Sequence, residues 1–141
     1  MIKFRGIPLE DVSDIDEVNF DGTFVYGNYV KYGDSVLIVG DMLEASEDGL
    51  WPSWWVTVDS KTVEQFTGLT DVNGKDIYEG DIIKSNYKYA QPKISQIIME
   101  DGNSYIAGED LATGNEMLVS DHVDEIEVIG NVHENPELLE V

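Results

Sequence analysis

Short apolar segments alternate with polar ones along most of the chain, and glycine, asparagine and aspartate separate them. Trp54, Val56 and Val58 fall on one face of a strand, with Trp55 and Thr57 on the other. Residues 35–40 are almost continuously apolar, which predicts a strand buried on both faces. Short strands punctuated by turn residues are typical of antiparallel sheets, so the pattern predicts a mainly β protein.

Further alternation predicts strands over residues 2–5, 23–32, 62–66, 82–83, 95–100, 104–107, 117–119 and 124–130. The Gly27-Asn28 pair predicts a bulge or a tight turn inside the second of these. Asp101-Gly102-Asn103 predicts a hairpin, and Thr113-Gly114-Asn115 predicts another turn. Residues 41–53 read as an acidic connection, whose first six residues allow one short helical turn.

The segment from Gly68 to Lys84 contains three glycines and an Asn-Gly pair that supplies the positive φ values of a tight turn. A glycine-containing turn that leads into a strand is how small SH3-like barrels often begin. We therefore expect an N-terminal antiparallel β lobe over residues 1–67, packed on an SH3-like small barrel over 68–135, with a tail at 136–141. The residues of interest in this signature turn are Gly68, Asp71, Asn73, Gly74, Ile77, Tyr78, Glu79, Gly80 and Asp81.

The 141 residues carry 29 Asp and Glu against 8 Lys and Arg, a formal net charge of −21. A charge of that sign repels phosphate backbones and anionic lipid surfaces, so direct nucleic-acid or membrane binding is not expected. The chain contains no cysteine, which excludes disulfides and thiol catalysis. No apolar run approaches the roughly 18 residues of a membrane helix, and no signal peptide is visible.

Four carboxylates, Asp71, Asp76, Glu79 and Asp81, gather around the signature turn and are the best candidates for acid–base chemistry. The structural alternative is stronger, because Asp71 can accept backbone hydrogen bonds in an Asx turn and Asp81 can cap the start of a strand. A calcium loop is not supported, since the glycine after Asn73 comes two positions too early.

The sequence contains no motif for a histidine-based site, a serine nucleophile or a phosphate-binding loop. His122 and His133 have no recurring carboxylate spacing, and no serine lies in a nucleophile elbow. Gly74-Lys75 is followed by Asp76, which would repel a phosphate. We therefore predict no catalytic, cofactor-binding or metal-binding residues, and a protein that is not an enzyme.

Aromatic residues offer a second possible surface. The three tryptophans and three of the tyrosines could stack nucleic-acid bases, with three lysines as the basic patch beside them. The alternative is that the tryptophans fill the core or an interface, where aromatic residues are enriched. The aromatic residues are Trp51, Trp54, Trp55, Tyr87, Tyr89 and Tyr105, and the lysines are Lys84, Lys88 and Lys93.

Three segments resemble the YopX family of proteins encoded by phages and prophages of Gram-positive bacteria. The opening segment is FRG at residues 4–6 with FVYGNYV at 24–30, the central one is QFTGLTDVNGKDIYEGDI at 65–82, and the terminal one is EVIGNVHENPELL at 127–139. The resemblance implies an oligomer-forming β protein in a bacterial cytoplasm, and it transfers no catalytic residues.

These observations favour a non-enzymatic phage accessory or regulatory protein that binds a host or phage protein and self-assembles. Its negative field would steer basic partners, and short edge strands invite pairing between copies. The alternatives are an acidic nucleic-acid mimic that binds a basic host protein, and a small hydrolase that uses Asp76, Glu79 or Asp81.

Overall fold

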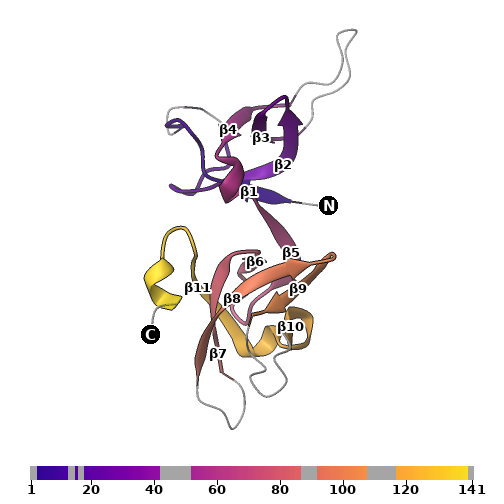
Figure 1. Ribbon diagram of the computed structural model, residues 1–141, viewed down its shortest axis with the longest axis vertical. Coiled ribbons are helices and arrows are strands. Elements are labelled where there is room, and N and C mark those ends of the chain that lie inside the picture. The colour runs from indigo at the N-terminus through magenta and orange to yellow at the C-terminus, as the bar shows by residue number, and fades with distance from the viewer. Residues whose placement is uncertain are drawn as a thin grey trace. The chain divides into compact units, whose positions relative to one another are not determined.

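The computed structural model describes residues 3–12, 15, 18–41, 52–86, 92–107 and 117–139. The protein is mainly β, as predicted, and its sheets are antiparallel. The chain divides into two compact units, Met1–Gln65 and Phe66–Val141 (Figure 1). Among the described residues, no helix combines the length and the apolar character needed to cross a bilayer. The SH3-like assignment of the second unit stays a prediction.

The first unit is built on strands in the order β4-β3-β2-β1-β5, with β5 continuing into the second unit. Its core consists of Val12, Val25, Val36, Ile38, Trp54, Val56 and Val58, with Phe4, Val18, Phe20 and Val63 packed against it. The elements are β1 (Phe4–Gly6), β2 (Val25–Tyr32), β3 (Ser35–Val39), β4 (Trp55–Val58), the 3₁₀ turn η1 (Ser60–Thr62) and β5 (Glu64–Thr70).

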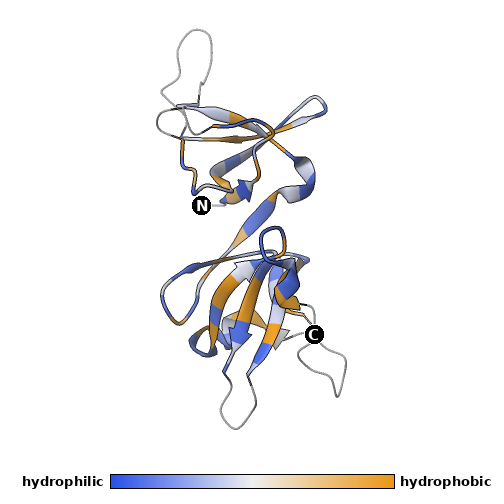
Figure 2. Cartoon of the chain, turned by 90° about the vertical axis from the view of Figure 1, so that its left-hand side faces the viewer, coloured by the Kyte–Doolittle hydropathy of each residue, from blue (hydrophilic) through white to orange (hydrophobic). Residues whose placement is uncertain are grey.

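In the second unit, β6 pairs with the later part of β5, and a five-stranded sheet has the order β10-β9-β8-β7-β11. Figure 2 shows apolar and polar residues alternating along its strands. Ile77, Ile83, Ile97, Ile106, Val119 and Ile126 form its core. The elements are β6 (Asp76–Tyr78), β7 (Asp81–Ser85), β8 (Lys93–Glu100), β9 (Asn103–Ile106), β10 (Met117–Leu118), β11 (Ile126–Asn131) and the 3₁₀ turns η2 (Val119–Asp121), η3 (Val123–Glu125) and η4 (Pro136–Leu139).

The predicted hairpin around residue 102 is confirmed. Glu100 pairs with Asn103, and the two residues between them have φ values of 51° for Asp101 and 84° for Gly102. Two consecutive positive φ values are what a two-residue turn of type I′ requires, and Asp-Gly is a preferred sequence for it. The local sequence therefore determines the register of β8 and β9.

Several predicted boundaries are wrong. The strand expected at 62–66 begins at Glu64, after the η1 turn, and continues to Thr70. Val119 belongs to the η2 turn and not to a strand, and the first strand is Phe4–Gly6. The helical turn at 41–46 and the turn at 113–115 fall largely or wholly outside the described residues.

The bulge or turn expected at Gly27-Asn28 is also wrong, because β2 runs without interruption through both residues. A Cβ atom added at Gly27 would lie 2.3 Å from the carbonyl oxygen of Val39. Glycine is therefore needed here for the close approach of a neighbouring backbone, and not for a change in chain direction.

We expect the substitution Gly27→Ala to lower the free energy of unfolding by about 2 kcal/mol, because the added methyl group must displace the Val39 carbonyl. Urea denaturation measures this loss. Gly102→Asn is the control, since no atom lies within 4 Å of an added Cβ there and asparagine tolerates its backbone conformation. Equal stability of the Gly27→Ala variant and the wild type would show that the close approach has no energetic role.

Candidate functional site

The signature turn is organised by the buried carboxylate of Asp71. Its Oδ1 accepts hydrogen bonds from the backbone N–H groups of Asn73 and Lys75, at 2.8 and 2.9 Å. The backbone N–H of Gly74 donates to the Asp71 carbonyl at 2.9 Å, and Gly74 has a φ of 81°. Asp71 thus forms the expected Asx turn, with Gly74 supplying the left-handed backbone.

The same side chain ties the turn to β11. Oδ2 of Asp71 accepts a hydrogen bond from the backbone N–H of Val128 at 2.8 Å, and the backbone N–H of Val72 donates to the Ile126 carbonyl at 3.1 Å. Three N–H groups therefore converge on one carboxylate, two from its own turn and one from a strand 57 residues away. Both oxygens of the Asp71 carboxylate therefore hold backbone groups in place.

A second buried carboxylate, Asp81, closes the following turn. Its Oδ2 accepts from the backbone N–H of Tyr78 at 2.8 Å. The backbone of Gly80 connects β8 with the residue that follows β11, since its N–H donates to the Ile97 carbonyl and its carbonyl accepts from the N–H of Val132. Asp81 also pairs with Asn131 where β7 meets β11. Both buried carboxylates of the predicted cluster thus hold backbone groups in place.

The remaining signature residues lie in β5, in β6 and in the turn before β7. Gly68, with a φ of 86°, sits in β5 where the register with β6 shifts between Phe66 and Thr70. Ile77 is fully buried in the core of the second unit. Asp76 begins β6, and Glu79 lies in the turn between β6 and β7.

The terminal segment is ordered by Asn131. Its Oδ1 accepts from the backbone N–H groups of His133 and Glu134, at 2.9 Å each, and its Nδ2 donates to Glu134 Oε1 at 2.7 Å. A Cβ atom added at Gly130 would lie 2.6 Å from Asn135 Oδ1, so a larger residue there requires the Asn135 side chain to move. Through Asp81 and Asn131, the central and terminal segments form one hydrogen-bonded frame.

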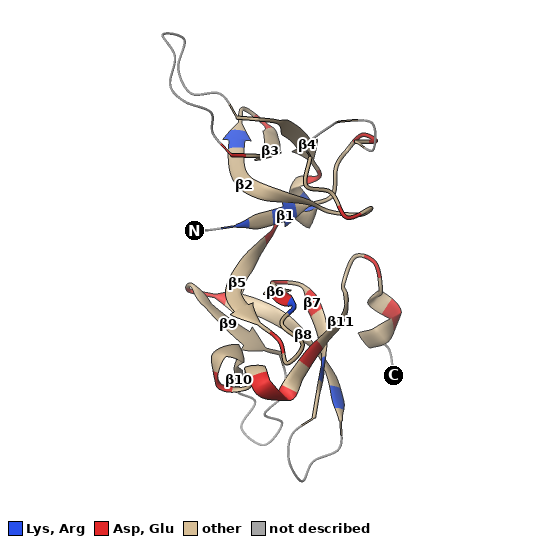
Figure 3. Cartoon of the chain, turned by 180° about the vertical axis from the view of Figure 1, so that it is seen from behind, with Lys and Arg blue, Asp and Glu red and all other residues tan. Residues whose placement is uncertain are grey.

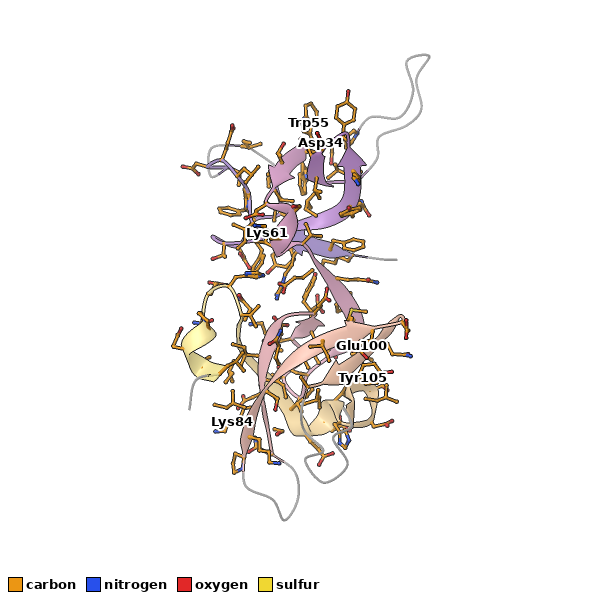
Figure 4. The ribbon with its side chains drawn as sticks, viewed as in Figure 1. Asp34, Trp55, Lys61, Lys84, Glu100 and Tyr105 are labelled. Atoms are coloured by element: carbon orange, nitrogen blue, oxygen red, sulfur yellow. The ribbon has the colours of Figure 1, made fainter. Side chains whose placement is uncertain are left out.

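A different kind of surface lies on the first unit. Among its described residues, Leu9 is 62% exposed, Ile15 48% and Trp55 59%, and the aromatic residues Tyr29 and Tyr32 of β2 are exposed as well. Leu9, Ile15 and Trp55 line one groove of about 270 Å³, together with Glu10, Asp11, Val12, Val56 and Thr57. We call it the Trp55 groove. Figure 4 labels Trp55, whose side chain projects from β4.

Local backbone pairing holds the two walls of the Trp55 groove together. The backbone N–H of Leu9 donates to the Thr57 carbonyl at 3.0 Å, and the N–H of Asp59 donates to the Ile7 carbonyl at 2.9 Å. Val12 and Val56 are buried beneath the groove. The exposed apolar side chains therefore stand on a fixed backbone, and the groove carries two acidic residues and no basic one among its described lining residues.

Comparison with known proteins identifies the family. The sequence model of the family described as YopX protein matches residues 39–140. The chain belongs to the YopX family. A crystal structure of protein EF1440 from Enterococcus faecalis is similar over 99% of both chains, with 26% sequence identity and a TM-score of 0.50. The comparison with curated proteins finds no match.

The resemblance seen in the sequence is therefore confirmed. The matched range of this YopX-family protein contains the central and terminal segments, which form the frame around Asp71 and Asn131. It begins after the opening segment, whose two parts pair with each other as β1 and β2. The central and terminal family segments thus contain the polar residues whose side chains hold the backbone of the second unit in place.

The residues of the possible aromatic surface are divided between the two units, and four of them lie outside the described residues. Trp54 is buried in the first unit, while Trp55 projects from the opposite face of the chain into solvent. Tyr105, Lys84 and Lys93 belong to the second unit, where Lys84 and Lys93 lie near the ends of β7 and β8 (Figure 3). Trp51, Tyr87, Lys88 and Tyr89 lie outside the described residues.

The histidines do not converge either. His122 Nδ1 lies 3.0 Å from Glu125 Oε1, whereas the backbone N–H of His133 donates to Asn131. Within the described ranges, no group of three or more His, Asp and Glu residues has the arrangement of a metal site.

The Trp55 groove was missed by sequence reasoning. The one signal for it in the sequence is Trp55 on the otherwise polar face of the 54–59 strand, for which the sequence predicts a place in a core or an interface. Leu9 and Ile15 gave no signal, because they fall in an acidic segment without periodicity.

Proposed function

We propose that this YopX-family protein is a non-enzymatic protein-binding module, and that the Trp55 groove is its recognition surface. The observation that carries the proposal is the joint exposure of Leu9, Ile15 and Trp55 around one groove. A tryptophan surrounded by aliphatic side chains is typical of the residues that dominate binding energy at interfaces. Apolar groups gathered in this way mark interaction sites on soluble domains.

The charge of the groove selects the partner. Glu10 and Asp11 line it, and the whole chain carries a net charge of −21. A complementary ligand is a protein segment with one or two large apolar residues flanked by lysine or arginine. The apolar residues bury Trp55, and the basic residues lie near the carboxylates and accelerate association.

A second copy of this chain is a weaker candidate for the groove, because two such copies repel each other. Self-assembly stays a prediction, which light scattering at several salt concentrations tests directly. The proposed setting is the cytoplasm of a bacterium that carries a phage or prophage.

The experiment uses two peptides of equal length, one alternating leucine with lysine and one alternating leucine with glutamate. We expect the basic peptide to bind the full chain and the acidic peptide not to bind. Trp55→Ala should weaken binding of the basic peptide by about 30-fold, the effect of losing a side chain that contributes about 2 kcal/mol. Isothermal titration calorimetry measures the affinities.

Tyr32→Ala is the matched control, because Tyr32 is an exposed aromatic residue of the same unit that does not line the groove. Both variants keep the net charge, so any non-specific attraction of a basic peptide is the same in the two. Equal affinities of the two variants would contradict the proposal. That result would instead favour diffuse charge recognition, as expected of a nucleic-acid mimic.

The hydrolase alternative has less support, since Asp71 and Asp81 accept backbone hydrogen bonds through their carboxylates. An activity screen of the wild type beside Asp76→Asn and Glu79→Gln variants tests it. We expect no turnover that depends on either residue.

A further inference from the structure

The Trp55 groove opens where the outer edge of β4 loses its neighbouring segment. The residues before the groove run antiparallel to β4, since the backbone N–H of Leu9 donates to the Thr57 carbonyl at 3.0 Å and Pro8 forms a bridge with Val58. Within the described ranges, no backbone hydrogen bond continues this pairing past Leu9 toward Trp55. The two sides of the groove come from the residues that follow Leu9 and from β4.

The backbone of Trp55 points toward this opening. Hydrogen-bonded and non-hydrogen-bonded residue pairs alternate along an antiparallel ladder. The backbone N–H of Gly40 donates to the Trp54 carbonyl at 3.0 Å, which makes these two residues a hydrogen-bonded pair. The next pair, Val39 with Trp55, is therefore a non-hydrogen-bonded one. The N–H and carbonyl groups of Trp55 thus point away from β3, to the side on which the Thr57 carbonyl accepts its hydrogen bond.

This stretch of the β4 edge is open, whereas the edge of β11 is covered. In the part of the chain that the structure describes, no hydrogen bond is found to the backbone groups of Trp55 that face the groove. On β11, the Ile126 carbonyl accepts from the N–H of Val72, and the N–H of Val128 donates to Asp71. An open strand edge is a template for pairing with another chain.

We propose that the partner segment binds the Trp55 groove in extended form and adds a strand to the edge of β4. This inference rests on the proposed function and specifies the conformation of the bound partner. A backbone carbonyl of the segment accepts from the Trp55 N–H, and a backbone N–H of the segment donates to the Trp55 carbonyl. Strand addition obtains affinity from such main-chain hydrogen bonds and specificity from alternate side chains.

The side chains around the groove fit an added strand, because successive side chains of a strand point to opposite faces. Apolar residues at every second position lie against Leu9, Ile15 and Trp55, which are all exposed. The lysine or arginine residues between them supply the charge opposite to that of Glu10 and Asp11. A helix uses its backbone groups internally, so it would leave the Trp55 groups without a partner.

The experiment uses the full chain and three forms of a peptide with equal numbers of alternating leucine and lysine residues. One form is unmodified, one carries a methyl group on every leucine backbone nitrogen, and one carries it on every lysine backbone nitrogen. The two methylated forms have the same mass and charge, and neither regains pairing by sliding two residues along the edge. Each methyl group removes a backbone donor and blocks the approach of a strand. Isothermal titration calorimetry measures the affinities.

We expect one methylated peptide to bind at least about tenfold more weakly than the unmodified peptide, and the other to bind within about twofold of it. The leucine-methylated peptide loses affinity if the added strand is antiparallel, and the lysine-methylated peptide does so if it is parallel. Hydrogen exchange of the Trp55 backbone N–H should slow when the unmodified peptide binds. Exchange at Val128, which already donates to Asp71, should not change.

Two failures are distinguishable. Equal affinities of the two methylated peptides, whether both are weakened or both unchanged, overturn strand addition and leave the groove as a binding surface for side chains. An unmodified peptide that does not bind overturns the proposed function together with this inference.

Discussion

We expect Asp71→Ala to lower the free energy of unfolding of the second unit by about 3 kcal/mol, a large effect for one turn residue. The substitution removes the carboxylate that accepts hydrogen bonds from the N–H groups of Asn73, Lys75 and Val128. Hydrogen bonds to charged groups contribute more than neutral ones, and the Val128 N–H lies in a strand where water is partly excluded. Chemical denaturation followed by circular dichroism measures the loss.

Two further variants make this test specific. Asp71→Asn keeps one acceptor oxygen and should lose less stability than Asp71→Ala. Glu100→Ala, at an exposed acidic residue beside the β8–β9 turn, should change stability by less than about 0.5 kcal/mol. If Asp71→Ala and Glu100→Ala were equally stable, the turn would not depend on Asp71.

The second large effect concerns the buried ion pair of the first unit. Arg5 Nε and Nη2 lie 3.0 and 2.9 Å from Glu64 Oε1, and the Arg5 guanidinium lies 4.3 Å from the centre of the Phe24 ring. We expect Arg5→Met to lower the free energy of unfolding by about 3–5 kcal/mol, because it leaves the Glu64 carboxylate buried without its cation.

A double-mutant cycle separates this loss from simple packing. The variant Arg5→Met/Glu64→Leu should be more stable than Arg5→Met alone, since replacing both charges removes the unpaired carboxylate. Lys61→Met, at an exposed lysine of η1, is the control and should be close to the wild type (Figure 4). Strict additivity of the Arg5 and Glu64 substitutions would show that the pair is not coupled.

The parts of the fold that sequence reasoning predicted are those determined by local chemistry. Asp101-Gly102 supplies the two positive φ values of its hairpin, and Asp71 forms an Asx turn with its own neighbours. Both depend on residues no more than four positions apart. The alternation of Val56 and Val58 likewise placed one face of β4 in the core.

What the sequence did not predict depends on contacts between distant segments. Gly27 is glycine because of the Val39 carbonyl, which belongs to another strand. The third hydrogen bond of Asp71 comes from Val128, far along the chain. The Trp55 groove combines an irregular acidic segment with β4, and no periodicity in either segment reveals that they meet.

In this YopX-family chain, the residues that stabilise the fold differ from those that we propose bind a partner. The central and terminal family segments use their polar residues, Asp71, Asp81 and Asn131, to position backbone in the second unit. The proposed recognition surface uses exposed apolar residues of the first unit. Substitutions in the family segments should therefore reduce stability first, whereas substitutions in the groove should reduce binding with little loss of stability.

The most direct test of this account is a map of backbone and indole N–H signals of the full chain during titration with the basic peptide. We predict that the largest shifts fall on Leu9, Ile15, Thr57 and the Trp55 indole, while the signals of the signature turn remain in place. Shifts centred on residues 71–81, with an unchanged Trp55 indole, would contradict it.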